Sequence, residues 1–183
     1  MFPDSLPLLQ LPGFSLRQMQ LTDASAWYDY LCLPAVWQHT SWNVQQAEEL
    51  LPSLQAFASN LPDAPRRFAV IEDNSGRLAG TVGFHTVSAL NRTAELAYDF
   101  HPDYWGRGLA TAAAQVALHW ALQEGALHRV QATVLPSNLG SIRVIEKAGM
   151  QFEGLLRNFR MVRGVSKDFR LYASVCDADA KQS

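Results

Sequence analysis

The sequence lacks long hydrophobic runs, and no apolar stretch approaches the ~20 consecutive residues that a helix needs to span a bilayer. Pro3, Pro7 and Pro12 interrupt the N-terminal segment, which has no basic stretch before an apolar one, so we expect no secretory signal peptide. Cysteine is scarce, with only Cys32 and Cys176 among 183 residues. Such a chain has no disulfide framework and fits a reducing compartment, which predicts a cytoplasmic protein without a membrane partner.

A surplus of positive charge is also missing. The formal net charge is −2, whereas a dedicated nucleic-acid-binding domain normally carries a basic excess. The five histidines form no HExxH motif and no Cys/His ligand spacing. We therefore expect neither nucleic acid nor a metal ion among the partners of this chain.

The composition that is present is that of a globular domain. Hydrophobic residues make up 48% of the sequence, and 183 residues are enough to bury a core without disulfides or metals. Segments of alternating or continuous apolar residues predict strands at 14–19, on either side of the turn DNSG within 67–87, and at 93–100, 128–135, 150–156 and 169–175. Four helices are expected among these strands. The order predicts one α/β domain over residues 1–183, with a mixed sheet and a core at about 14–175.

The expected helices have recognisable ends. Thr22 is a candidate N-cap of the first helix, and Asn43 with Gln46 three residues later resembles a capping box for the second. Pro52 falls inside the second helical pattern and should kink or restart it. The other two helices are expected to end at glycines: 109–124 before Gly125, and the short helix after Asn138 before Gly149.

The stretch YWGRGLAT, residues 104–111, joins the strand expected at 93–100 to the helix expected from 109. A helix N-terminus exposes unpaired N–H groups with partial positive charge, and glycine lets an anion approach the backbone closely. Gly106, Arg107 and Gly108 therefore suit a pyrophosphate, although a plain strand-to-helix turn is the alternative. No GxGxxG with a following acidic residue and no GK[ST] occurs, which argues against Rossmann and Walker-type loops.

A second element favours the ligand-binding interpretation. In LPSNLGSIRVIEKAGM, residues 135–150, an Asn follows the end of a strand, a short helix runs on from it, and Lys-x-Gly closes it. The two elements together resemble the Gcn5-related N-acetyltransferase (GNAT) superfamily, and more closely its ribosomal-protein-alanine/serine acetyltransferase branch. The resemblance extends into AELAYDFHPDYWGRGLAT and FEGLLRNFRMVRGVSKDFRLY and covers most of the chain from about 14 to 175. Trp105 stands where the phosphate loop of the superfamily has Gln or Arg, a replacement usual in this branch.

The resemblance implies a GNAT fold, in which a mixed, mostly antiparallel central sheet splays between two parallel strands and is flanked by helices. The splayed strands would be 93–100 and 128–134, with acetyl-CoA between them and no metal ion. Asn138 matches the Asn that orients the cofactor arm, and a simple helix N-cap is its alternative role. The resemblance assigns the pyrophosphate to the loop Trp105, Gly106, Arg107, Gly108, Leu109, Ala110 and Thr111, and the pantetheine arm to the chain around Phe100, His101 and Pro102.

Catalysis needs an acid for the leaving thiolate and a base or water relay for the attacking amine. Many GNAT enzymes use a Tyr seven residues after the Asn as the acid, but that position is Ile145 here. Ser141 is the substitute that this branch uses, unless it is an ordinary residue of the first helical turn. Glu95 and Asp99 are candidates for the base, and they share one face of a strand because they are four residues apart. Alternatively, they face solvent or pair with arginines.

The expected acceptor side carries charged and aromatic residues. Some ribosomal-protein members of the family have a Glu near the end of the segment after the motif E-G-x-x-R. Arg160 occupies that position here, which argues against a ribosomal substrate. Glu153 belongs to the motif itself and is interpreted as structural. A basic rim suits either an acidic acceptor surface or the 3′-phosphate of CoA, unless it is solvated surface; it consists of Arg157, Arg160, Arg163 and Lys167, with Asp168. An aromatic acceptor wall would favour a flat or apolar group near the amine; its residues are Trp37, His39 and Trp42.

The predicted function is transfer of an acetyl group from acetyl-CoA to a primary amine. The acceptor would be a protein N-terminus or a small molecule, and the enzyme a monomer or a homodimer. Two alternatives stay open: a non-catalytic acyl-CoA-binding module, and an enzyme that transfers another acyl group. A generic nucleotide-binding protein would bind ATP or NAD at the same site, which the missing motifs disfavour.

Overall fold

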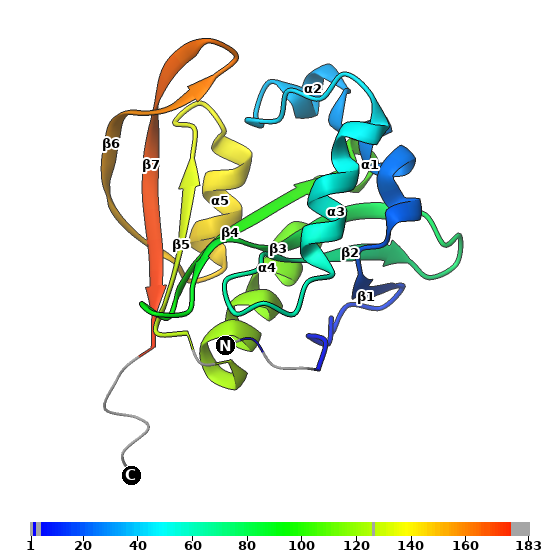
Figure 1. Cartoon of the computed structure of the whole chain (residues 1–183), viewed down its shortest axis with the longest axis horizontal. Coiled ribbons are helices and arrows are strands. Elements are labelled where there is room, and N and C mark those ends of the chain that lie inside the picture. Colours follow the sequence, from blue (N-terminus) through cyan, green and yellow to red (C-terminus); the bar gives the residue numbers. More distant parts are fainter. Residues whose placement is uncertain (1, 3–4, 126, 177–183) are drawn as a thin grey trace.

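The computed structural model describes residue 2, residues 5–125 and residues 127–176. Its centre is a seven-stranded sheet in the order β1-β2-β3-β4-β5-β7-β6 (Figure 1). The strands are β1 (Phe14–Gln18), β2 (Arg66–Glu72), β3 (Leu78–Ser88), β4 (Thr93–Phe100), β5 (Arg129–Val134), β6 (Gln151–Val162) and β7 (Val165–Val175). The α-helices are α1 (Ala24–Leu31), α2 (Pro34–Trp37), α3 (Leu51–Phe57), α4 (Leu109–His119) and α5 (Leu139–Lys147).

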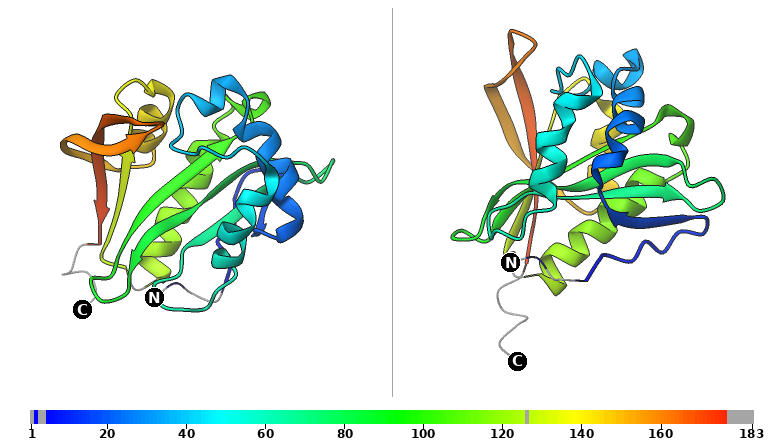
Figure 2. Two further views of the ribbon diagram at one scale, coloured as in Figure 1. Left: turned by 45° about the horizontal axis from the view of Figure 1, so that its top comes forward. Right: turned by 45° about the vertical axis from the view of Figure 1, so that its right-hand side comes forward.

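The sheet is antiparallel except at its centre, where β4 and β5 are parallel. This parallel pairing lasts for three residues, 93–95 against 129–131. β4 then continues beside β3 to Phe100, and β5 continues beside β7 to Val134, so the two strands diverge (Figures 1 and 2). The predicted mixed sheet with a splayed parallel pair is confirmed.

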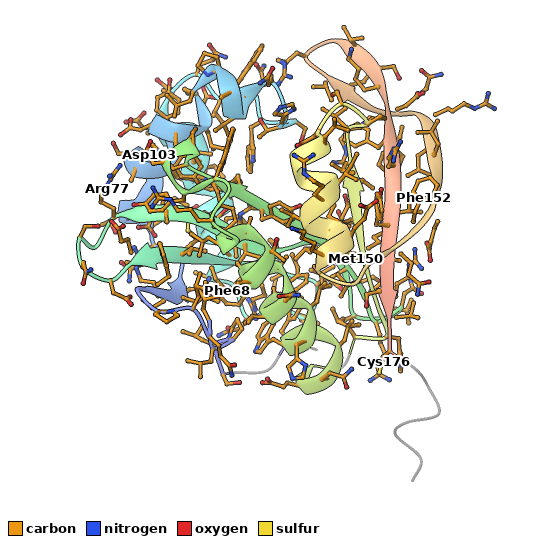
Figure 3. The ribbon with its side chains drawn as sticks, turned by 180° about the vertical axis from the view of Figure 1, so that it is seen from behind. Phe68, Arg77, Asp103, Met150, Phe152 and Cys176 are labelled. Carbon is orange, nitrogen blue, oxygen red and sulfur yellow. The ribbon has the colours of Figure 1, made fainter. Side chains whose placement is uncertain are left out.

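Helices cover both faces of the sheet. α1 and α3 lie in front of it in Figure 1, whereas α4 lies behind it and packs beside α5, as the reverse view shows (Figure 3). The α4 side contributes three alanines without exposed surface, Ala113, Ala114 and Ala117, whose small side chains let the helix approach the sheet closely. No helix in the described part of the chain is both long and apolar enough to cross a membrane.

Side-chain alternation along β4 divides its residues between the two faces. Ala94 and Leu96 belong to the large core under α4, whose other members include Phe84 and Trp120. Glu95 and Asp99 point to the opposite face, where a second core is built around Trp27, Tyr30, Leu50, Leu54 and Phe57. The predicted common face of the two carboxylates therefore agrees with the structure.

The second expected helix begins later than the sequence indicated. Residues 47–50 form a 3₁₀ turn, and Pro52 lies in the first turn of α3, where its missing N–H costs no helical hydrogen bond. The carboxylate of Glu49 accepts a hydrogen bond from the N–H of Gln45 at 3.0 Å. The capping box at Asn43 is therefore wrong, and the restart at Pro52 is confirmed.

The start of the first helix also differs. Thr22 is not its N-cap but lies within the 3₁₀ turn Leu21–Asp23, and Asp23 instead accepts from the N–H of Gln20 at 2.8 Å. Asp23 takes this capping role in place of Thr22 because Arg17 holds its carboxylate with two hydrogen bonds of 2.7 Å. The sequence also gave no sign of α2, which has only four residues.

The last two strands extend further than the sequence indicated and meet in a hairpin. β6 and β7 run on through the basic segment between the strands expected at 150–156 and 169–175, and the hairpin turns at Arg163 (φ +48°) and Gly164 (φ +77°). Two successive positive φ angles suit the twist of a hairpin.

The two glycines expected at helix ends differ in conformation. Gly125 closes the preceding helix in an extended conformation, because residues 120–124 are π-helical and its N–H donates to the Trp120 carbonyl. Gly149 has φ +93° directly after α5, as expected.

We expect Gly83→Ala to destabilise the protein by about 2 kcal/mol or more, because an added Cβ would lie 2.1 Å from the Arg66 carbonyl oxygen in the neighbouring strand. Gly154→Ala is the matched control, since no heavy atom lies within 4 Å of its Cβ position, and it should stay within about 0.5 kcal/mol of wild type. Urea unfolding measures both variants. Equal midpoints would contradict the close β2–β3 approach.

Candidate functional site

A cavity of about 530 Å³ opens at the N-termini of α4 and α5, beside the diverging part of β4. The loop before α4 borders it with Gly106 (φ +75°) and Gly108 (φ +80°), and Gly108 is the N-cap of α4. Residues other than glycine rarely adopt this left-handed conformation. The two glycines therefore let the loop fold so that the N-terminus of an 11-residue helix faces the cavity.

Most of the residues expected to bind the cofactor line this cavity: Phe100, Trp105, Gly106, Gly108, Leu109, Ala110, Thr111, Asn138 and Ser141. Three do not line it. The guanidinium of Arg107 lies over the ring of Tyr104, 5.8 Å from its centre, and the N–H of His101 donates to Ala79 on β3. Pro102 begins the short 3₁₀ turn after β4.

Trp105 affects the expected contact with the pantetheine arm. Its indole Nε1 donates to the Phe100 carbonyl oxygen at 2.8 Å, so that oxygen already has a partner. Because His101 points its N–H toward β3 and main-chain groups alternate along a strand, the N–H of Phe100 and the main-chain groups of Tyr98 point toward the gap. These are the groups of β4 that remain for an added extended ligand.

Two positively charged side chains that line the cavity were not predicted from the sequence. Arg143 and Lys147 line it from α5, one turn apart on the same face of the helix. Their spacing of four within the expected helix was the available signal. They supply positive charge that the sequence had attributed to Arg107.

Ser141 lines the cavity and contacts β4. Its Oγ is 2.6 Å from the hydroxyl of Tyr98, and that hydroxyl is 3.1 Å from the Ser141 carbonyl oxygen. Burial raises the pKa of Tyr98 well above its usual range, and the hydrogen bond with Ser141 offsets this in part, so Tyr98 is a neutral hydroxyl at pH 7. Asn138 Oδ1 accepts from the Ser141 N–H at 3.0 Å, which establishes the N-cap role. Ile145 is buried in the core.

A second cavity, of about 600 Å³, lies on the α1 and α3 side and includes Glu95, His85, Arg160 and Trp42 in its wall. Six residues line both cavities: His39, Thr40, Tyr98, Asp99, Asn138 and Ser141. The two cavities therefore meet where β4 and β5 diverge.

Glu95 is buried in the wall of the second cavity, with a side-chain exposure of 4%. Its Oε1 accepts from Thr133 Oγ1 at 2.5 Å and from Arg160 at 3.3 Å, and its Oε2 accepts from Gln131 at 3.4 Å. His85 Nε2 is 3.8 Å from the same Oε1. Burial lowers the pKa of His85, and the charge of Glu95 partly offsets that effect.

Asp99 is more fully engaged. Its Oδ1 accepts from Trp27 Nε1 (3.0 Å), the Tyr30 hydroxyl (2.5 Å) and Thr81 Oγ1 (2.8 Å), and its Oδ2 is paired with the buried guanidinium of Arg67. Burial raises the pKa of Tyr30, and the negative charge of Asp99 raises it further. Both expected base candidates thus pair with arginines, which was one of the alternatives in the sequence.

The β6–β7 hairpin reaches the segment after α2, as both Figures 1 and 2 show. Arg163 Nη1 donates to the carbonyl oxygens of Thr40 (3.0 Å) and Trp42 (3.4 Å), and the guanidinium lies 3.8 Å from the ring centre of Trp37. The basic rim does not line the first cavity: its other members either pair with Glu95 or are exposed, and Asp168 accepts from the N–H of Asn158. Glu153 pairs with Arg129.

Comparison with known proteins identifies the class. Residues 14–151 match the family described as Acetyltransferase (GNAT) domain. The chain is 29% identical over 163 residues to an uncharacterized N-acetyltransferase p20 of Bacillus licheniformis, covering 87% of this chain and 90% of that protein. It is 26% identical over 156 residues to the ribosomal-protein-serine acetyltransferase of Escherichia coli, covering 82% and 86%.

Solved structures agree. The ribosomal-protein-S5-alanine acetyltransferase from Vibrio fischeri superposes with a TM-score of 0.81 at 20% identity, over 92% of this chain and 96% of that one. Mycobacterium smegmatis RimJ in complex with CoA-disulfide superposes with a TM-score of 0.74 at 26% identity, over 93% of this chain and 84% of that one. This chain belongs to the GNAT acetyltransferase family, and it is an N-acetyltransferase by that membership. Its described residues contain no group of three or more His, Cys, Asp or Glu side chains able to hold a metal ion.

We expect Asp99→Asn to lower the free energy of unfolding by about 3–5 kcal/mol, because it leaves the buried guanidinium of Arg67 without its counter-charge. The control is Asp103→Asn. Asp103 is 61% exposed and lies 3.7 Å from Arg77 at the molecular surface (Figure 3), so its loss should cost less than about 1 kcal/mol. Urea unfolding monitored by tryptophan fluorescence distinguishes the two. Similar small losses in both variants would contradict a structural role of Asp99.

Proposed function

We propose that this chain transfers an acetyl group from acetyl-CoA to a primary amine, either a peptide N-terminus or a small molecule. The observation that carries the proposal is the meeting of the two cavities at Ser141. The first offers a helix N-terminus and two cations, which suit the phosphates of CoA. The second offers a walled space for an amine on the opposite face. We further propose that residues 14–175 act as one cytoplasmic catalytic domain, as a monomer or a homodimer.

In this proposal the loop from Trp105 to Thr111 holds the pyrophosphate, with main-chain N–H groups at the start of α4 as donors. Arg143 and Lys147 add charge from α5. The main-chain groups of Tyr98 and the N–H of Phe100 hold the pantetheine arm as an added strand would. The name of the RimJ structure, which reports bound CoA-disulfide, supports this choice of donor.

Acetyl transfer forms a C–N bond between the amine and the thioester carbon and breaks the C–S bond. Ser141 is the proposed acid for the departing thiolate, since its hydroxyl lies where the two cavities meet. The neutral hydroxyl of Tyr98, 2.6 Å away, orients it and can restore its proton. Asn138 fixes the start of α5, and thereby the position of Ser141.

The two carboxylates take different proposed roles. Glu95 faces the acceptor cavity and orients the amine, or a water molecule bound to it, by accepting a hydrogen bond. Asp99 has four donors on its two oxygens and holds the surrounding elements together. The E. coli relative supports a protein N-terminus as acceptor. Against this, Arg160 replaces the late Glu of some ribosomal-protein members and pairs with Glu95, which argues for an acceptor other than a ribosomal protein.

Calorimetric titration should show micromolar binding of acetyl-CoA and no binding of NAD or ATP. Gly108→Ala should weaken acetyl-CoA binding by about tenfold or more, because an alanine strains the left-handed N-cap and turns the N–H groups at the start of α4 away from the cavity. Gly13→Ala is the control: Gly13 has φ +84° with open space around it, in a turn before β1, so the strain is similar and the affinity should not change. Failure of the wild type to bind acetyl-CoA would leave the loop as a plain strand-to-helix turn.

Ser141→Ala should reduce release of free thiol from acetyl-CoA by about 10²-fold while leaving acetyl-CoA affinity unchanged, because a general acid acts on the transition state. The acceptors are peptides that begin with Ser or Ala, and spermidine. Ser137→Ala, at an exposed position just before α5, should behave as wild type. Normal turnover by Ser141→Ala would show that Ser141 is not the acid, and binding without thiol release by the wild type would favour the non-catalytic acyl-CoA-binding module.

A further inference from the structure

Among the arginine and carboxylate side chains that line the second cavity, that of Arg160 is by far the most exposed. Its side-chain exposure is 31%, whereas Glu95 and Asp99 in the same wall have side-chain exposures of 4% each. Arg67, the other arginine of the wall, is 6% exposed and is paired with Asp99. A molecule that enters this cavity therefore meets a guanidinium rather than a carboxylate.

The guanidinium of Arg160 has hydrogen-bond donors left for a ligand. An arginine carries five N–H donors and a permanent positive charge. One of these groups donates to Glu95 Oε1 at 3.3 Å, which is longer than the roughly 2.7–2.9 Å of a strong charge-assisted hydrogen bond. The remaining N–H groups of Arg160 make no hydrogen bond with the described part of the chain.

Two phenylalanine rings hold this guanidinium in place. Its Cζ lies 5.3 Å from the ring centre of Phe159 and 5.3 Å from that of Phe169. Such contacts engage the faces of the guanidinium, whereas its N–H donors point outward in its plane. The group is thus fixed while its edge stays available, which suits bidentate recognition of a carboxylate.

The neighbours of Arg160 allow it to take a second anion. Glu95 also accepts hydrogen bonds from Gln131 and Thr133, so it does not depend on Arg160 alone. Burial lowers the pKa of His85, which leaves that imidazole largely neutral at pH 7 despite its position 3.8 Å from Glu95. A carboxylate bound here would share the guanidinium with Glu95.

We propose that the acceptor is a free α-amino acid and that Arg160 binds its carboxylate. The inference rests on the acetyl transfer proposed above and names the acceptor class. The amine and the carboxylate of an α-amino acid are attached to the same carbon, and Glu95, which orients the amine in that proposal, is the direct neighbour of Arg160. Binding of the carboxylate to Arg160 therefore places the amine beside Glu95.

A peptide N-terminus lacks the group that Arg160 would bind. In a peptide the α-carboxylate of the first residue has become a neutral amide, which cannot form an ion pair with a guanidinium. The cavity of about 600 Å³ has room for a free amino acid, and its wall includes the apolar side chains of Trp42, Phe57, Leu135 and Phe169. The expected acceptors are therefore amino acids with an apolar side chain, such as phenylalanine and leucine.

The carboxylate takes no part in bond formation. The amine nitrogen forms a bond to the thioester carbon and gives up its proton to solvent, and the C–S bond breaks. The thiolate takes the hydroxyl proton of Ser141, which regains one through Tyr98, so the products are an N-acetyl amino acid and free CoA.

The first test compares L-phenylalanine and L-leucine with their amides as acceptors for the wild-type protein, with release of free thiol from acetyl-CoA as the readout. We expect kcat/KM for the acids to exceed that for the amides by about 10- to 100-fold, the range that hydrogen bonds to a charged group supply. The amine of an amino-acid amide loses its proton more readily than that of the acid, so amine basicity cannot produce this preference. Equal or higher kcat/KM for the amides would overturn the proposal.

The second test compares Arg160→Gln with Arg170→Gln. Arg170 also lies over a phenylalanine ring, with its Cζ 5.7 Å from the ring centre of Phe152, but it lines neither cavity. We expect Arg160→Gln to lose about 10- to 100-fold in kcat/KM with L-phenylalanine and little with the amide, because Gln keeps a donor for Glu95 but no charge. Arg170→Gln should keep the wild-type preference, and acetyl-CoA affinity by calorimetry should be unchanged in both variants.

The outcomes separate this inference from the proposed function. An unchanged preference in Arg160→Gln, or an equal loss with acid and amide, would overturn the role of Arg160 and leave the acetyl transfer standing. Faster acetylation of spermidine, or of a peptide that begins with Ser or Ala, than of the amino acids would overturn the acceptor class. The comparison of acids and amides uses the wild type alone, so it decides even where Arg160→Gln does not fold. A wild-type protein that binds acetyl-CoA but acetylates none of these probes would contradict the acetyl transfer itself, and this inference with it.

Discussion

The buried carboxylate of Asp99 is the constraint on which the site depends. It lies on β4 just after that strand has left β5, and it collects donors from α1, β2 and β3 at one point. A buried charge without partners would be very costly, so the chain can place a carboxylate there only if all these elements are in position. Asp99 thereby ties the α1 side of the sheet to the part of β4 that has no partner strand on its other edge.

The separation of β4 from β5 explains how two opposite faces of one sheet share a site. In a continuous sheet, Tyr98 and Asp99 would face separate compartments, because neighbouring side chains alternate. Here the sheet is open beyond residue 95, and α5 places Ser141 against Tyr98 in the opening. The first cavity lies toward α4 and α5 and the second toward α1 and α3, and Tyr98 and Ser141 line both.

Features set by local chemistry could be predicted from the sequence. The glycines at 106 and 108, the cap at Asn138 and the shared face of Glu95 and Asp99 each follow from spacing or from backbone conformation over a few residues. The resemblance to the GNAT family added the splayed strands, which short-range patterns do not encode.

Features that depend on distant partners could not be predicted. The donors to Asp99 come from residues 18 to 72 positions away, and Arg163 reaches carbonyl groups more than 120 residues earlier in the chain. Arg107 illustrates the same limit over a short distance: it belongs to the loop that borders the cavity, but its guanidinium lies over the ring of Tyr104 and Arg107 does not line the cavity. The sequence indicated which segments border the cavity but not the direction of their side chains.

The pairing of both carboxylates with arginines bears on how an amine is received. Asp99 with Arg67, and Glu95 with Arg160, leave the second cavity, the proposed acceptor site, with no surplus negative charge from these four groups. A cationic ammonium would gain little attraction there and would lose its hydration on entering, whereas a neutral amine pays less for the same transfer. If the second cavity receives the acceptor as proposed, it favours the deprotonated form of the amine, which is the nucleophile that attack on a thioester requires. In the proposed reaction, charge neutralisation at the two carboxylates therefore selects an amine close to losing its proton, because the neutral amine is transferred at the lower cost.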